Sequence, residues 1–275
     1  MPVDPVSPYS RPADLPPYQG ILVVDAEKFT AARSRDHQPL STEIARVVAE
    51  AARRSGLAAA WATPRFFNST GDGVAIGVPT ELLPRLVHPY LRYLQEILAE
   101  RNDNARRQDP LLRLRVSLNV GPLPGNGDNP FFDGNGKPRN DAHRLLDSKV
   151  AKMMLAASSD TVTHVVAILS DRVYEDVVEG GYAGLHPDHF VDVSAVVPGK
   201  SFTQHAWLHI PAPSANLLRG GVLPAPPEES STPAPRQEGK NDHVTITAHD
   251  GAQAAGTVHG GMTMYRRPPT ERGDR

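Results

Sequence analysis

The sequence predicts a sandwich of the α+β class, with α/β as the alternative, in which helices cover a mostly antiparallel β-sheet. Two stretches carry this prediction. The run Ile21-Leu22-Val23-Val24 is unbroken and apolar, as expected of a central strand that is buried on both faces. Residues 112–120 alternate apolar and polar side chains, which is typical of a strand with one face in water. Helical patterns on either side of these strands supply the covering layers.

One amphipathic helix follows the first strand, which we expect over 20–24. Ser41-Thr42-Glu43 opens this helix, and Gly56 stops it. Apolar residues between these points recur with the spacing of one helix face, so the helix has a side to bury. They are Ile44, Val47, Val48 and Ala51.

A hairpin is predicted next. Residues 61–67 have the composition of a strand, and a short turn at 69–72 returns the chain into a further strand over 74–78. This arrangement places Asp72 at the tip of the hairpin.

The second half of the domain alternates helices and strands. A helix is expected within 80–102, where Pro89 marks either a kink or the true beginning. Gly, Pro, Asn and Asp make 121–139 a loop. Beyond it we expect a helix over 140–157, a strand over 165–169, a short helix over 170–179 with Ser170 as N-cap, and closing strands over 190–193 and 203–210.

Proline-rich stretches divide the 275 residues into four parts. Residues 1–17 are predicted to be a disordered lead, 18–211 the folded domain, and 212–241 a linker. The tail over 242–275 contains short alternating segments that favour β-strands able to recruit a protein partner, the alternative being a disordered tail.

Composition narrows the class of protein. The net charge of −2 and pI near 6.6 give no sign of a nucleic-acid or acidic-membrane partner. The absence of cysteine fits a reducing compartment, and no apolar run approaches the length of a membrane span. These features predict a cytoplasmic protein.

Two aspartates stand at the mouths of predicted strands. Asp25 ends the first strand, and Asp72 lies in the Gly71-Asp72-Gly73 turn. Two such carboxylates are able to share divalent cations, because Mg²⁺ takes one or two carboxylates and completes its shell with water and phosphates. Either aspartate alone is also explained by a helix cap or a turn.

Five fragments, in this order and spacing, resemble the class III nucleotidyl cyclases, which include the adenylate and guanylate cyclases. The fourth fragment keeps the family's spacing of four residues between an Asn and an Arg. The fragments are residues 24–30, 69–73, 114–122, 140–148 and 197–200. The resemblance implies a ferredoxin-like cyclase fold and the conversion of a nucleoside triphosphate into a 3′,5′-cyclic nucleotide and pyrophosphate.

The resemblance also implies a metal and phosphate site in the first half of the chain. Asp25, Asp72 and the carbonyl of Ala26 would hold two Mg²⁺ or Mn²⁺ ions. Backbone N–H groups around Phe29 and Thr30 would receive the terminal phosphate.

The second half of the site comes, in the family, from another subunit. Asn140 would orient the ribose, Arg144 would stabilise charge on the α-phosphate, and Lys200 would neutralise the triphosphate. A chain that carries both halves is therefore expected to form a head-to-tail homodimer.

Departures from the family pattern leave the base and the activity open. Asn68 replaces the lysine usual in adenylate cyclases, and Asp133 stands at the partner base-reading position. The substrate is thus ATP, GTP, or UTP/CTP as in bacterial anti-phage pyrimidine cyclases, which would link the protein to antiviral defence. Arg139 replaces a Val, and Asn119 the usual His. These two changes favour an alternative: an inactive nucleotide-binding module that recruits its partner through the tail.

Overall fold

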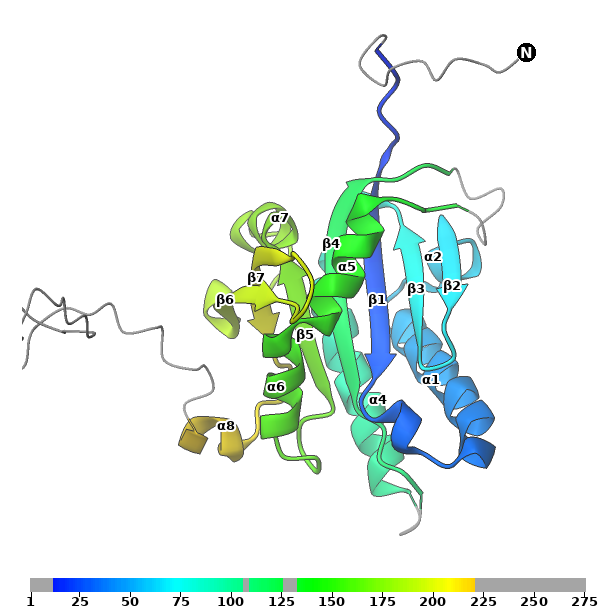
Figure 1. The fold of residues 1–275 in the computed structure, drawn as a ribbon, viewed down its shortest axis with the longest axis vertical. Helices are drawn as coiled ribbons and strands as arrows, with labels where there is room; N and C mark the ends of the chain where they lie inside the picture. Colours follow the sequence, from blue (N-terminus) through cyan, green and yellow to red (C-terminus); the bar gives the residue numbers. More distant parts are fainter. Residues whose placement is uncertain (1–11, 106–108, 126–132, 221–275) are drawn as a thin grey trace, which may run out of the picture. The chain divides into compact units, whose positions relative to one another are not determined.

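The computed structural model describes residues 12–105, 109–125 and 133–220, and these form a seven-stranded sheet covered by helices (Figure 1). The strand order is β2-β3-β1-β4-β5-β7-β6, and β4 and β5 are the one parallel pair of neighbours in this described sheet. The predicted α+β class is confirmed. The strands are β1 (Tyr18–Ala26), β2 (Phe66–Ser69), β3 (Gly73–Val78), β4 (Leu114–Pro122), β5 (Val165–Ser170), β6 (Phe190–Val196) and β7 (Thr203–His209).

Strand β1 lies inside the sheet, between β3 and β4. Its side chains alternate between two cores. Leu22 and Val24 belong to the core on one face of the sheet, whereas Ile21 and Val23 belong to a smaller core on the other. All four side chains are at most 2% exposed. Burial on both faces is the physical reason for the unbroken apolar run.

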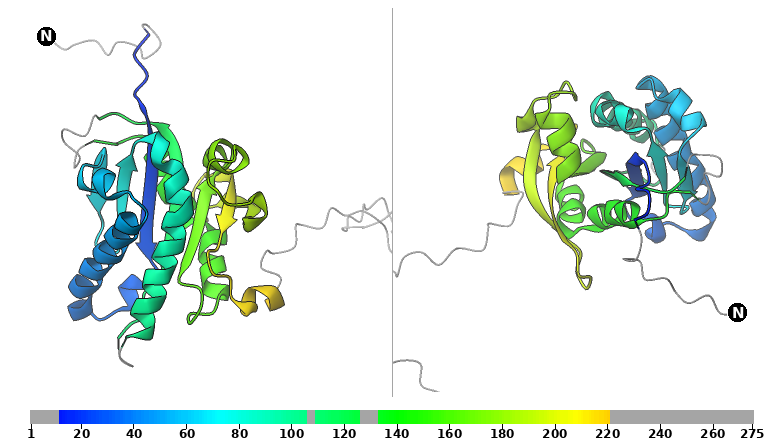
Figure 2. Two further views of the ribbon diagram at one scale, coloured as in Figure 1. Left: turned by 180° about the vertical axis from the view of Figure 1, so that it is seen from behind. Right: turned by 90° about the horizontal axis from the view of Figure 1, so that it is seen from above.

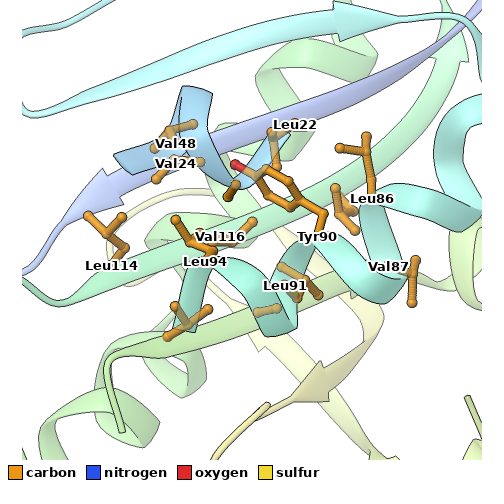
Figure 3. Close-up of a cluster of buried hydrophobic side chains, with 14 of the residues drawn as sticks. Leu22, Val24, Val48, Leu86, Val87, Tyr90, Leu91, Leu94, Leu114 and Val116 are labelled. Atoms are coloured by element: carbon orange, nitrogen blue, oxygen red, sulfur yellow. The ribbon is translucent and has the colours of Figure 1, made fainter. Parts of the chain in front are cut away.

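Helices α1 (Ser34–Arg54) and α4 (Leu91–Asp103) cover the first face and pack on each other (Figure 2). Tyr90 is fully buried between them and the sheet, against Leu22 and Leu94 (Figure 3). Burial raises the pKa of the Tyr90 hydroxyl above its usual range.

The segment between β3 and α4 is irregular. It contains short turns over Thr80–Leu82, Leu83–Arg85 (α3) and Leu86–Tyr90. His88, just before Pro89, has an extended backbone with φ −150° and ψ 127°, because proline disfavours the helical conformation in the residue before it. The predicted interruption at Pro89 is confirmed.

Helices α5 (Lys137–Asp147) and α6 (Lys149–Ala157) cover the second face, with a short α8 (Ala215–Gly220) beside α6. Leu145 of α5 and Leu155 of α6 pack in a core with Ile168 of β5 and Leu208 of β7. α7 (Asp171–Val173) continues into a wider turn over Tyr174–Glu179 and packs into the first core. Its predicted N-cap is confirmed, since the Ser170 hydroxyl accepts the Val173 N–H.

The strand predicted over 61–67 is wrong in its first half. Trp61 lies in a short helix, α2 (Ala58–Ala62), and β2 begins only at Phe66. Alanine has the highest helix propensity, so this alanine-rich segment completes a helical turn before Pro64. The hairpin itself is confirmed, because β2 and β3 pair with Ser69 opposite Val74.

The wet face predicted for the strand over 112–120 is also wrong. α5 lies across this face of β4, and Ser117 and Asn119 are buried beneath it. Ser117 Oγ donates to the Ala142 carbonyl at 2.7 Å, and Asn119 Nδ2 donates to the Pro138 carbonyl at 2.8 Å. Ser117 and Asn119 therefore bind helix carbonyls rather than solvent, so Asn119 has a structural role here.

The helix predicted over 140–157 is two helices. The first begins three residues earlier, at Lys137. Ser148 separates the two with an extended backbone, φ −58° and ψ 148°, and its hydroxyl caps α6 by accepting the Ala151 N–H. α1 likewise begins before its predicted opening, at Ser34.

Most of the predicted terminal segments lie outside the described residues. Residues 1–11 of the lead, residues 221–241 of the linker and the whole tail over 242–275 belong to this group. The first part of the linker forms α8, whose Leu217 is buried. Among the described residues, no helix is both long and apolar enough to cross a membrane.

Candidate active site

The structure brings the two candidate metal aspartates together. Asp25 is near the end of β1, and its register partner on β3 is Gly73, the residue after Asp72. The N–H of Ala26 donates to the carbonyl of Asp72 at 2.9 Å. A Cβ atom on Gly73 would lie 2.0 Å from the Val24 carbonyl oxygen, so glycine is what permits this close approach.

The pKa of the Asp25 carboxyl group is raised by burial and by the neighbouring carboxylate of Asp72. Burial raises its pKa, the Arg115 cation lowers it, and the neighbouring Asp72 raises it again, for a net value of about 6. The carboxyl groups of Asp25 and Asp72 are near enough to share a hydrogen bond. Such a shifted carboxyl beside a second one is common at functional sites, and a cation between them would relieve the repulsion.

Arg115 is a site residue that the sequence reasoning missed. It faces Asp25 across the β1–β4 pair, and the two side chains form an ion pair. The Arg115 side chain is 12% exposed, and its Nε is buried without a hydrogen-bond partner among the described residues. A buried, incompletely used guanidinium donor fits an anionic ligand. The signal in the sequence was its place on the polar side of residues 112–120, where Arg115 stands two residues before Ser117.

The segment after Asp25 is a tight turn whose Phe29 ring packs against α1. Lys28 has a left-handed backbone with φ 57°, and a 3-10 turn follows over Phe29–Ala31. The Phe29 ring stacks on His37 at 4.8 Å between centroids. Thr30 is exposed. The predicted phosphate-binding segment therefore has a defined backbone next to the aspartate pair.

Arg113 anchors this turn to the sheet. Its Nη1 donates to Glu27 at 3.0 Å, and its other nitrogens donate to the carbonyls of Thr163, Leu155 and Ser158. The Arg113 side chain is only 6% exposed, so Glu27 supplies the charge that a buried guanidinium requires. Glu27 is thereby directed to Arg113 and is not a third ligand beside Asp25.

The predicted ribose and phosphate residues sit on α5. Asn140 is exposed, and Arg144 lies one turn further along. Arg144 donates to the buried carboxylate of Asp141 at 3.2 Å and lies 5.7 Å over the Phe202 ring. Phe202 belongs to the core of β5, β6 and β7, whereas Asp25 is on β1 between β3 and β4. One chain thus carries the two halves of the predicted site on different elements.

Lys200 lies in the turn between β6 and β7 and is exposed. Gly199 before it has φ +75°, and the Lys200 N–H donates to the Val197 carbonyl at 3.2 Å. Lys200 and Arg144 are therefore on the same side of the domain, since the turn is anchored by Phe202.

The two candidate base-reading residues are linked through Phe66. Asn68 is half-buried on β2, two residues after Phe66. Asp133 packs against Gly125, and a Cβ atom on the next residue, Gly134, would lie 2.2 Å from the Phe66 ring. Both candidates therefore border the same edge of the sheet.

The donor set suits Mg²⁺ or Mn²⁺. Two carboxylates and a nearby carbonyl leave most of a metal's shell for water and phosphate oxygens, as Mg²⁺ prefers. Among the described residues, no group of three or more His, Asp or Glu side chains is arranged to hold a metal. An all-protein cage such as a structural zinc site is therefore absent from this part of the chain.

No protein-family model and no curated protein matches the chain. Among solved structures, it is similar to a bacterial light-regulated adenylyl cyclase, with a TM-score of 0.50 and 13% identity over 76% of this chain and 55% of that one. The chain shares the fold of a cyclase. It is also similar to the guanylyl cyclase Cya2 (TM-score 0.48, 14% identity, 70% of this chain and 91% of that one). A further match is the guanylate cyclase domain of RhGC from Catenaria anguillulae in complex with GTP (TM-score 0.44, 17% identity, 72% of this chain and 99% of that one).

The match to the bacterial light-regulated adenylyl cyclase confirms the fold that the sequence resemblance implied. At this identity the likeness is one of fold, and it leaves the activity, the base and the predicted pyrimidine type as predictions.

Proposed function

We propose that this protein is a metal-dependent nucleotidyl cyclase, which converts a nucleoside triphosphate into a 3′,5′-cyclic nucleotide and pyrophosphate. The observation that carries the proposal is the convergence of Asp25 and Asp72 at the mouths of adjacent strands in a cyclase fold. In such a reaction the 3′-hydroxyl attacks the α-phosphate, so the protein contributes mainly positioning and charge stabilisation.

The first half of the proposed site handles metal and phosphate. Asp25, Asp72 and the Ala26 carbonyl would hold two Mg²⁺ or Mn²⁺ ions, which supply activation of the 3′-hydroxyl and neutralisation of the phosphates. Arg115 donates to an anionic oxygen beside them, which its unpartnered Nε supports. The amides near Phe29 and Thr30 bind the terminal phosphate.

The second half comes from another copy of the chain. Arg144 and Lys200 lie with the core of β5 to β7, and Asp25 and Asp72 lie at β1 and β3, which supports a head-to-tail homodimer with two composite sites. There Asn140 orients the ribose, Arg144 stabilises charge on the α-phosphate, and Lys200 binds the triphosphate.

Asn68 and Asp133 would select the nucleobase of the substrate. An amide both donates and accepts, so Asn68 suits a purine or a pyrimidine edge. ATP, GTP, UTP and CTP are all candidates, and the link to antiviral defence depends on a pyrimidine.

The second candidate function is an inactive nucleotide-binding module whose tail recruits a partner. The ion pair between Arg115 and Asp25 favours it, because the pair neutralises one of the two metal carboxylates.

One assay separates the two functions. The full chain is incubated with Mn²⁺ or Mg²⁺ and each of the four nucleoside triphosphates, and cyclic nucleotide and pyrophosphate are quantified. We expect equimolar products from one base class, and loss of turnover in Asp72→Ala. Asp176→Ala, which removes an exposed carboxylate paired with Arg172, is the matched control and keeps full activity. Turnover that survives Asp72→Ala contradicts the assigned roles; nucleotide binding with no product supports the inactive module.

A further inference from the structure

Lysines gather at one groove on the second face of the sheet. The groove has a volume of 430 Å³ and lies between α6 and the β6–β7 turn. Lys149 and Lys152 line it from α6, and Lys200 lines it from the turn. The whole chain contains six lysines, so half of them meet at this place although the chain's net charge is −2.

The backbone on the β6–β7 side of the groove is held by a hydrogen bond and by core packing. The β6–β7 turn is closed by the Phe202 N–H, which donates to the Lys200 carbonyl at 2.8 Å. Val197 and Phe202, on either side of the turn, are buried at 7% and 6% exposure in the core that also holds Leu155 of α6. The backbone that presents the three ammonium groups is therefore fixed by packing.

The positive charge of the groove is largely uncompensated. Asp147 is the one carboxylate among its described lining residues, and Lys152 Nζ lies 2.8 Å from it. The ion pairs of the described residues include none for Lys149 or Lys200. Arg144, over the Phe202 ring, is not one of the lining residues and is paired with Asp141.

We propose that this groove binds a linear polyphosphate of two or more phosphates, with Lys149 and Lys152 as the binding residues not assigned above. The inference rests on the proposed function, whose substrate and product both carry such a group. Lysine ammonium groups on flexible stems act as point charges for phosphate oxygens, and three of them from two segments match several anionic oxygens better than a single phosphate.

The test measures binding without metal or turnover. Tripolyphosphate, pyrophosphate and orthophosphate are titrated into the full chain by calorimetry in the presence of a chelator. We expect tripolyphosphate to bind at least tenfold more tightly than orthophosphate, and Lys149→Gln/Lys152→Gln to lose at least tenfold in affinity. Lys149→Arg/Lys152→Arg keeps the charge and most of the affinity. Arg53→Gln/Arg92→Gln removes two exposed cations from α1 and α4 and changes the affinity less than twofold.

The arms of the experiment locate the ligand. If Lys149→Gln/Lys152→Gln raises the KM for the nucleoside triphosphate, the groove takes the substrate; if it raises only the inhibition constant of pyrophosphate, the groove takes the product. Equal affinity for orthophosphate and tripolyphosphate, or an unchanged affinity in the Gln variant, overturns the inference. A chain that binds tripolyphosphate through these lysines but makes no cyclic nucleotide refutes the proposed function and leaves this site standing.

Discussion

Arg115 of β4 stands opposite Asp25 of β1, and their side chains form an ion pair at the mouth of the candidate site. Both side chains are mostly buried, at 12% and 18% exposure, so the charges interact with little solvent screening. A metal ion that binds Asp25 therefore competes with the guanidinium. The pair links the affinity for metal to the affinity for an anionic ligand, because an anion that takes Arg115 frees the carboxylate.

We predict that Arg115→Gln raises the affinity for Mn²⁺ and lowers that for the nucleoside triphosphate. Removal of the competing cation should tighten Mn²⁺ binding by roughly tenfold, which corresponds to about 1.4 kcal/mol. The titration is done by electron paramagnetic resonance at pH 8, which lies above the pKa of about 6 of Asp25 in the wild-type chain. Equal Mn²⁺ affinities in the two proteins would show that the ion pair does not oppose metal binding.

Gly73→Ala is expected to disrupt the approach of Asp72 to β1. The new Cβ would lie 2.0 Å from the Val24 carbonyl oxygen. The backbone of β1 is paired with a strand on each side, so moving this carbonyl away would break hydrogen bonds of the sheet. Overpacking of this kind costs about 1–3 kcal/mol or more. Urea unfolding measures the change. Gly181→Ala is the control, because its φ of +78° adds strain while nothing lies within 4 Å of the new Cβ. A smaller loss for Gly73→Ala than for Gly181→Ala would contradict the packing described here.

His205 predicts a pH dependence of stability. Burial lowers its pKa, but hydrogen bonds to Asp192 at 2.5 Å and Asp171 at 2.7 Å raise it by more. The stabilisation from the charged ring is therefore complete below the unfolded pKa of about 6.5 and is lost as the pH rises through the higher folded pKa.

Unfolding of His205→Gln by urea should show this dependence. The side chain is 46% exposed, so solvent screening limits the effect to less than about 1 kcal/mol. We expect a larger loss of stability at pH 5.5 than at pH 9. The same loss at both pH values would refute the prediction for His205.

Much of the fold was predictable because burial leaves a clear pattern in sequence. The apolar run from Ile21 to Val24 predicts a strand that is buried on both faces. The Gly71-Asp72-Gly73 turn predicts the tip of a hairpin. Each of these patterns is typical of one kind of structure, and the structure contains both. Periodicity could not show that α5 covers Ser117 and Asn119. A polar side chain that bonds to a helix carbonyl looks the same in sequence as one that bonds to water.

The candidate site was predictable only in part for a similar reason. Asp25 and Asp72 stood out as a pair, because two carboxylates at strand ends are able to share a cation, although either one alone is explained by a helix cap or a turn. Arg115 and Arg113 did not, because they share one alternating strand, and only the register opposite Asp25 and the contact with Glu27 give them separate roles. The lysine groove depends on the packing of α6 against the β6–β7 turn, which no local pattern encodes.

The composite site predicts complementation between inactive variants. Asp72→Ala and Arg144→Ala each remove one half of both sites in a homodimer. If the halves come from different chains, mixing the two variants should restore one intact site per mixed dimer, and up to about a quarter of the wild-type turnover when half of the dimers are mixed. Recovery is followed by pyrophosphate release. A mixture as inactive as its components would place both halves in one chain.

Mn²⁺ binding at the aspartate pair is the most direct test of this account. The full chain is titrated with Mn²⁺ in the presence of a non-cyclising nucleoside triphosphate analogue, and bound ions are counted by electron paramagnetic resonance. We predict two ions per site in the wild-type chain and at least a tenfold loss of affinity in both Asp25→Asn and Asp72→Asn. Unchanged Mn²⁺ binding in both variants would contradict the account.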